Sequence, residues 1–319
     1  MALTQKQTQW FAQTFDALVT NVEAAILGKR RVIEFAFTAM VSEGHLLLED
    51  FPGTGKTALA RAMSATLKGS SSRIQFTPDL LPGDVTGITV YDQKKGAFEF
   101  HPGPIFANVV LADEINRASP KTQSALLEAM EERQVTIDGT THSLGLPFLV
   151  IATQNPIEHA GTYRLPEAQL DRFMMKTSIG YPDPAVSMKI LENANVAEAK
   201  VPAIITPQVL IDMAELVGQV HVDSLVLDYI VRLVEATRHA PQVRMGVSVR
   251  GARALTKASK TWALAQGRDF VTPDDVKVLA ESVLAHRIVL DPEAEFDGVT
   301  SRAVIAQILL DTLPPSRNS

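Results

Sequence analysis

The chain contains Leu46-Leu47-Leu48-Glu49-Asp50-Phe51-Pro52-Gly53-Thr54-Gly55-Lys56-Thr57, an apolar run that leads into a short loop with two glycines. A helix is expected to follow from Ala58. Glycines let backbone N–H groups turn toward an anion, the lysine reaches the outer phosphates, and the threonine hydroxyl binds Mg²⁺. The positive end of the helix points at the same charge. We therefore predict a polyphosphate-binding loop made of Pro52, Gly53, Thr54, Gly55, Lys56, Thr57 and Ala58.

The loop departs from the pattern G-x-x-x-x-G-K-[ST] at one position, where Asp50 stands in place of the first glycine. A strand-to-helix turn with a solvated lysine is the alternative interpretation. The position of the loop between an apolar strand and a helix favours the phosphate site. Because Gly53–Thr57 keep the part of the pattern that surrounds the phosphates, we expect the function of the loop to survive the substitution at Asp50.

Composition limits the classes of function. The chain has 319 residues, 46% of them hydrophobic, which is enough for two domains with a core each. A net charge of −6 with both signs interspersed argues against nucleic acid as a partner. The absence of cysteine excludes disulfides, cysteine-bound metals and a thiol nucleophile. The polar N-terminus and the lack of an apolar run of about 20 residues predict a cytoplasmic protein without membrane insertion.

The order of the expected elements predicts an α/β fold followed by helices. Helices are expected over 5–27 and 30–42, and apolar strands over 45–49, 73–77, 108–112, 148–153 and 174–179. Strands that alternate with helical or loop segments favour a mainly parallel sheet covered on both faces. Amphipathic helices are then expected over 185–194, 207–218, 224–239, 248–265 and 273–285, with no strand among them. We predict an α/β domain over residues 1–195 and an all-helical domain over residues 196–319.

Two apolar strands end in polar side chains that suit phosphate chemistry. Asp113 and Glu114 follow the strand at 108–112, at the sheet edge where open α/β sheets bind ligands. Asp113 is a candidate Mg²⁺ ligand together with Thr57, and Glu114 is a candidate to orient or deprotonate the attacking water. Asn155 follows the strand at 148–153 and can hold that water or a phosphate oxygen, although Asn-Pro is also a common turn signal.

Three segments resemble the MoxR-type AAA+ ATPases: Asp113-Glu114-Ile115-Asn116-Arg117-Ala118, Thr153-Gln154-Asn155-Pro156 and Leu165-Pro166-Glu167-Ala168-Gln169-Leu170-Asp171-Arg172-Phe173. The resemblance implies an AAA+ αβα sandwich with a parallel five-stranded sheet and a small all-α lid. It also implies assembly into a ring, typically a hexamer, with ATP and Mg²⁺ held between subunits.

The same resemblance implies roles for single residues. Glu114 would be the catalytic glutamate, Asn155 the sensor 1 residue, and Arg172 the arginine finger that enters the neighbouring subunit's site, with Arg117 as the alternative. Gly246-Val247-Ser248-Val249-Arg250 resembles the sensor 2 segment, with departures at Val247 and Val249. Ser248 is expected to cap a helix and to place Arg250 where it can touch the γ-phosphate.

Two segments resemble hairpin insertions of the family. Residues 91–100 alternate around a Lys-Gly tip, and residues 134–143 contain Asp138-Gly139 as a turn. Such hairpins line a ring pore or face a partner, the alternative being a solvated hairpin without a role. The resemblance implies remodelling or maturation of a client protein, with a von Willebrand factor A (VWA) domain protein as one expected partner. The alternatives are a nucleic-acid motor and a chelatase-type subunit that drives metal insertion.

Overall fold

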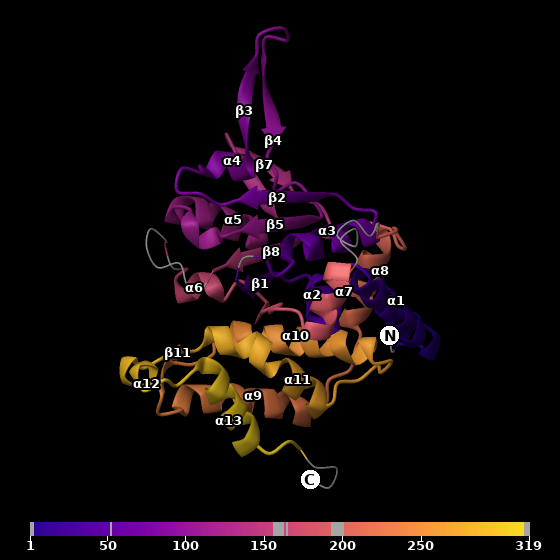
Figure 1. Cartoon of the computed structure of the whole chain (residues 1–319), viewed down its shortest axis with the longest axis vertical. Helices are drawn as coiled ribbons and strands as arrows, with labels where there is room; N and C mark the ends of the chain where they lie inside the picture. The colour runs from indigo at the N-terminus through magenta and orange to yellow at the C-terminus, as the bar shows by residue number, and fades with distance from the viewer. Residues whose placement is uncertain (1–2, 52, 156–162, 164, 193–200, 316–319) are drawn as a thin grey trace.

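The computed structural model describes residues 3–51, 53–155, 163, 165–192 and 201–315. Its centre is a parallel five-stranded sheet in the order β2-β5-β8-β1-β9 (Figure 1). The strands are β1 (Leu46–Glu49), β2 (Ser71–Gln75), β5 (Val109–Asp113), β8 (Leu149–Gln154) and β9 (Met175–Thr177). All five strands that the sequence predicts are present, with ends that differ by one or two residues.

Alternating side chains of the sheet supply two separate cores. Leu46, Leu48 and Leu111 belong to one hydrophobic cluster, whereas Leu47 and Val110 belong to the other. The first core includes residues of α1 (Gln5–Glu23), α2 (Arg30–Val41) and α3 (Lys56–Thr66) and of the helices at the C-terminal end; the second includes those of α4 (Pro82–Thr86) and α5 (Pro120–Glu132). Because side chains of a strand point to opposite faces in turn, both faces of this sheet are covered.

The buried residue His45 joins three elements at the edge of the sheet where the strands begin. Its Nδ1 accepts a hydrogen bond from the backbone N–H of Val150 at 3.0 Å, so its Nε2 donates to the carbonyl of Met130 at 3.0 Å. Burial lowers the pKa of His45 to about 4, and the ring is therefore neutral near pH 7. The end of α5 thus lies beside the starts of β1 and β8.

The second part of the chain is mainly helical. Its helices are α7 (Pro184–Glu192), α8 (Pro207–Gly218), α9 (Ser224–His239), α10 (Val249–Ala265), α11 (Pro273–Leu284), α12 (Pro292–Phe296) and α13 (Ser301–Asp311). The expectation that no strand occurs here was wrong, because β10 (Val243–Met245) pairs antiparallel with β11 (Val289–Leu290). The domain boundary predicted at 195/196 falls in residues 193–200, outside the described residues.

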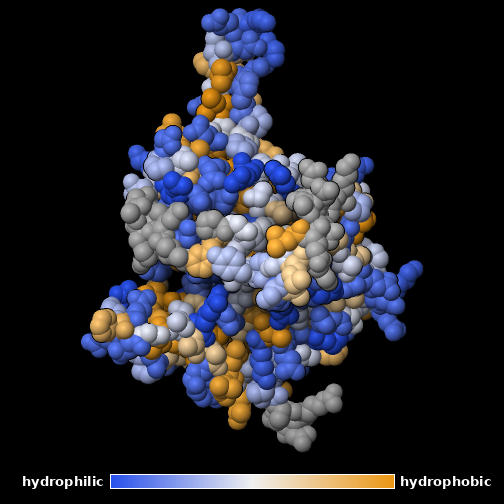
Figure 2. Space-filling model, viewed as in Figure 1, coloured by the Kyte–Doolittle hydropathy of each residue, from blue (hydrophilic) through white to orange (hydrophobic). Residues whose placement is uncertain are grey.

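Both predicted hairpins form. β3 (Gly87–Asp92) pairs with β4 (Ala97–Pro102), and β6 (Gln134–Ile137) pairs with β7 (Thr140–Ser143). The β3–β4 hairpin projects from the molecule (Figure 1), and hydrophobic side chains lie along it (Figure 2), where Ile88, Val90 and Phe98 are exposed. Among the described helices, none has the length and apolar character needed to cross a membrane.

Candidate nucleotide-binding site

The loop after β1 has the backbone geometry that an anion cradle needs. Gly53 and Gly55 have φ angles of 82° and 95°, in the left-handed region that favours glycine, and Gly55 directly precedes α3. The first N–H groups of a helix lack intrahelical partners, so those of Lys56, Thr57 and Ala58 are available to a phosphate. Lys56 Nζ donates to the carbonyls of Asp50 and Phe51 at 3.2 and 3.1 Å, which keeps the ammonium over the loop. Pro52 lies outside the described residues.

Asp50, the residue that departs from the glycine pattern, has a structural role. It is buried, and its carboxylate accepts hydrogen bonds from the backbone N–H groups of Ile179 at 2.5 Å and Gly180 at 2.9 Å. A glycine could not make these bonds. Asp50 therefore ties the start of the phosphate loop to the segment that leaves β9, while Gly53 and Gly55 keep the conformations that the loop requires.

Asp113 and Glu114 lie at the edge of the sheet where the strands end, as predicted. The buried Asp113 accepts from the Thr153 hydroxyl at 2.6 Å and from Arg73 Nη2 at 2.7 Å. Glu114 adopts a left-handed backbone conformation with φ of 58°, and its N–H donates to Thr153 Oγ1 at 2.8 Å. A left-handed non-glycine residue is uncommon, and here the β8 threonine holds it directly after Asp113.

Two side chains of β2 and Arg117 form a network around both acids. Gln75 Nε2 donates to Glu114 Oε2 at 2.8 Å, and Arg117 Nη1 donates to the same oxygen at 3.0 Å. Arg73 Nη2 donates to Gln75 Oε1 at 2.9 Å as well as to Asp113, which fixes the orientation of the amide. Sequence reasoning missed Arg73 and Gln75. No local signal in the sequence marks them, because their roles depend on the pairing of β2 with β5.

The residues around Asp113 suit a magnesium ion. Mg²⁺ prefers oxygen ligands and keeps several waters, so one hydroxyl and one carboxylate suffice on the protein side. The Thr57 hydroxyl has no hydrogen-bond partner among the described residues, and Asp113 presents a carboxylate at the same sheet edge. The ion would replace Arg73 as the positive charge at Asp113. Asn155 follows β8 at this edge, next to the strand that ends in Asp113.

Arg172 and Arg250 lie together, away from the phosphate loop of their own chain. Arg172 Nε is 3.1 Å from one carboxylate oxygen of Glu131, and Arg250 Nη2 contacts the other oxygen. Glu131 is the residue after Met130, whose carbonyl meets His45 at the sheet edge where the strands begin. Arg250 therefore lies away from the phosphate loop of its own chain, and its contact with a γ-phosphate stays a prediction. The edge where the strands begin and the edge where they end are separated by the length of β1, which is about 13 Å for four residues.

The helical part docks at this same edge through a buried guanidinium. Arg287 Nε donates to Asp171 Oδ1 at 2.6 Å, and its Nη2 donates to the carbonyl of Phe173 at 2.6 Å. Burial lowers the pKa of Arg287, while the charge of Asp171 acts in the opposite direction. The predicted cap Ser248 accepts from the N–H of Gly251 at 3.4 Å and donates to Asp171 Oδ2 at 3.2 Å. This docking explains why Arg250 lies beside Arg172.

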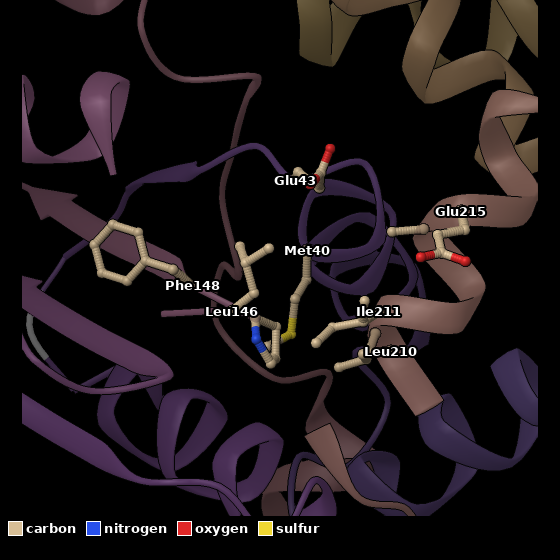
Figure 3. Close-up of a pocket in the computed structure, with 9 residues that line it drawn as sticks. Met40, Glu43, Leu146, Phe148, Leu210, Ile211 and Glu215 are labelled. Atoms are coloured by element: carbon tan, nitrogen blue, oxygen red, sulfur yellow. The ribbon is translucent and has the colours of Figure 1, made fainter. Parts of the chain in front are cut away.

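Described residues of the core and of the helical part enclose hollows between them. A cavity of about 240 Å³ is shown in Figure 3, where Met40, Leu146, Leu210 and Ile211 point toward one another. It is apart from the phosphate loop. A cleft of about 1060 Å³ is lined by Glu131, Arg172 and Arg250 among others.

Comparison with known proteins agrees with this geometry. Residues 45–175 match the model of the ATPase family associated with various cellular activities (AAA), and residues 235–308 match the model of the AAA lid domain. A crystal structure of an inferred ATPase from Cytophaga hutchinsonii superposes with a TM-score of 0.90 at 37% identity, covering 97% of each chain. The fold and the site thus define an AAA+ ATPase with a helical lid.

Similarity to individual proteins identifies one family within the AAA+ ATPases. The chain is 40% identical to chaperone MoxR1 of Mycobacterium tuberculosis over 315 residues, covering 96% of this chain and 84% of that protein. It is 31% identical to protein MoxR of Paracoccus denitrificans, with 90% and 92% covered, and 47% identical to YeaC of Bacillus subtilis, with 94% and 95% covered. The chain belongs to the MoxR family of AAA+ ATPases.

Proposed function

We propose that this protein is a ring-forming, Mg²⁺-dependent ATPase whose catalytic pocket is shared between two copies. One copy supplies the phosphate loop with Lys56 and Thr57, and Asp113 and Glu114 beside it. Arg172 and Arg250 of the next copy complete the pocket. The observation that carries this proposal is the shared contact of both arginines with Glu131, at the sheet edge opposite the phosphate loop.

The chemistry follows from the residues of each copy. Lys56, Thr57 and the first N–H groups of α3 bind the triphosphate, and Mg²⁺ held by Thr57 and Asp113 supplies positive charge at its oxygens. Glu114 orients the attacking water and accepts its proton, after its hydrogen bond from Gln75 is released, and Asn155 holds the water or a γ-phosphate oxygen. Guanidinium groups from the next copy stabilise the charge on the transferring phosphoryl group. Hydrolysis then depends on assembly.

Arg117 is the less suitable candidate for the arginine that crosses between copies. Its Nη1 contacts Glu114 of its own chain, at the sheet edge that carries the phosphate loop. Arg172 lies at the other edge with Arg250. A head-to-tail contact brings opposite faces of neighbouring subunits together, which is the arrangement that a closed ring uses. We assign the crossing role to Arg172 and Arg250. The ring that we expect is a hexamer.

We propose that ATP binding and hydrolysis drive remodelling or maturation of a client protein in the cytoplasm. The projecting β3–β4 hairpin supports this, because it exposes Ile88, Val90 and Phe98, which suit contact with an apolar segment. The bases of the two hairpins meet, since the rings of Phe100 and His142 stack with centroids 3.9 Å apart. A protein with a VWA domain is one partner of this kind.

Turnover per subunit should depend on protein concentration. At saturating Mg²⁺ and ATP, we expect the ATPase rate per subunit to rise with total protein and to level off once rings are complete. Dilute subunits should still bind ATP, because each copy carries its own phosphate loop. Steady-state ATPase assays and fluorescent-nucleotide titrations over the same concentrations measure both. A rate per subunit that is constant down to concentrations at which only monomers sediment would contradict the proposal.

A further inference from the structure

Glu131 holds two guanidinium groups from different parts of the chain with one carboxylate. Oε2 contacts Arg172 Nε at 3.1 Å, and Oε1 contacts Arg250 Nη2. Arg172 precedes β9 of the core, whereas Arg250 is in the first turn of α10 in the lid. Two guanidinium groups repel each other, so a shared anion is required to keep them side by side.

The cleft around these residues has an excess of positive charge. Its described lining includes seven arginine and lysine residues but three acids. Two of these acids have other partners, since Glu43 pairs with Arg133 and Lys257, and Asp171 pairs with Arg287. Among the described residues that line the cleft, Glu131 is thus the one acid that pairs with Arg172 and Arg250. The cleft is suited to a further anion.

The contacts of Glu131 are exchangeable. The side chains of Glu131, Arg172 and Arg250 are 35%, 29% and 45% exposed, and ion pairs that reach solvent contribute little to stability. A terminal phosphate carries more charge than a carboxylate and offers three acceptor oxygens to guanidinium groups. A phosphate that enters the cleft should therefore displace Glu131 from both arginines.

We propose that Glu131 is a positioning residue which holds Arg172 and Arg250 as a pair in the unassembled subunit, and that the terminal phosphate of ATP on the neighbouring copy displaces it. The inference rests on the proposed function, because it needs both arginines to meet the neighbour's nucleotide. Since Arg250 belongs to the lid, the exchange also links the position of the lid to the nucleotide in the next subunit. Glu131 opposes assembly in the absence of ATP and makes it depend on the triphosphate.

The test compares ring assembly of Glu131→Gln and Glu128→Gln proteins, both made in a Glu114→Gln background so that ATP persists. Glu128 is three residues earlier on α5, is exposed, and has no ion pair among the described residues, so it matches the change in charge. Sedimentation velocity with Mg²⁺ and ATP gives the subunit concentration at half-assembly. We expect Glu131→Gln to lower this concentration roughly fivefold relative to Glu128→Gln, because two exposed ion pairs no longer favour the free subunit.

The two possible failures are distinguishable. If Glu131 only fastened the lid to the core, Glu131→Gln would assemble at the same or a higher concentration than Glu128→Gln, and this inference would be overturned. Arg172→Ala and Arg250→Ala proteins in the same background test the proposed function itself. If these variants assemble with ATP as readily as the Glu114→Gln parent, the shared pocket is wrong. If they assemble poorly and Glu131→Gln shows no gain, only the role of Glu131 is wrong.

Discussion

Glu114→Gln protein should bind ATP as the wild type does and lose at least about 100-fold in turnover, because the amide cannot accept the proton of the attacking water. The fold should be retained, since a glutamine can still accept the hydrogen bond from Gln75 and is attached to the same backbone, held by Thr153. Thr153 also keeps Asp113 in place through its hydroxyl. The phosphate loop and the metal site are therefore unaffected.

Single-turnover ATPase assays and nucleotide titrations separate these two effects in Glu114→Gln. Glu132→Gln on α5 is the matched control, because Glu132 is exposed and belongs to the opposite end of the helix that follows Glu114. The control should retain wild-type turnover. Hydrolysis by Glu114→Gln at the wild-type rate would remove Glu114 from the chemistry and leave another group to activate the water.

Lys56→Ala protein should lose nucleotide binding, with an affinity for ATP lower by roughly 100-fold or more, because a charge-assisted contact to the outer phosphates is removed. The cost to folding should be small. The lysine contacts the carbonyls of Asp50 and Phe51 within the loop and takes no part in either core. Asp50 and Phe51 follow β1, so neither of these carbonyl oxygens belongs to a strand of the sheet.

Isothermal titration with ATP measures the effect of Lys56→Ala, and thermal unfolding without nucleotide checks the fold. Lys121→Ala is a suitable control, because Lys121 is an exposed lysine in the first turn of α5. ATP should raise the midpoint of unfolding of the control but leave that of Lys56→Ala unchanged, since only a ligand that binds the native state stabilises it. If the Lys56→Ala protein retained its affinity for ATP, the phosphate-binding site would lie elsewhere in the chain.

The strands and the phosphate loop could be predicted because their signals are local. Apolar runs that end in Gly53–Thr57 or in Asp113-Glu114 specify a strand, its C-terminal edge and a chemical function within a few residues. The cap at Ser248 was predicted for the same reason, and its hydroxyl does accept from Gly251. The short pair β10 and β11 was missed because three and two residues are too few to show an alternating pattern.

The placement of Arg250 could not be predicted from the sequence. It depends on which edge of the sheet the lid packs against, and that is fixed by the buried Arg287 contact with Asp171, 116 residues away. No local pattern marks such a contact. The roles of Arg73 and Gln75 depend in the same way on the pairing of β2 with β5, which brings Gln75 beside Asp113. Contacts between strands distant in sequence emerge only with the topology.

The shared pocket is tested most directly by mixing two inactive variants. Lys56→Ala lacks a phosphate loop that binds ATP but keeps both arginines, whereas Arg172→Ala binds ATP but supplies no finger. Each should be inactive alone. An equimolar mixture should recover at least about a quarter of wild-type activity, because half of the loops and half of the arginine donors are intact, and random placement around the ring already joins them at about a quarter of the contacts. A mixture as inactive as its parents, at a concentration where rings form, would contradict a pocket completed by the neighbouring copy.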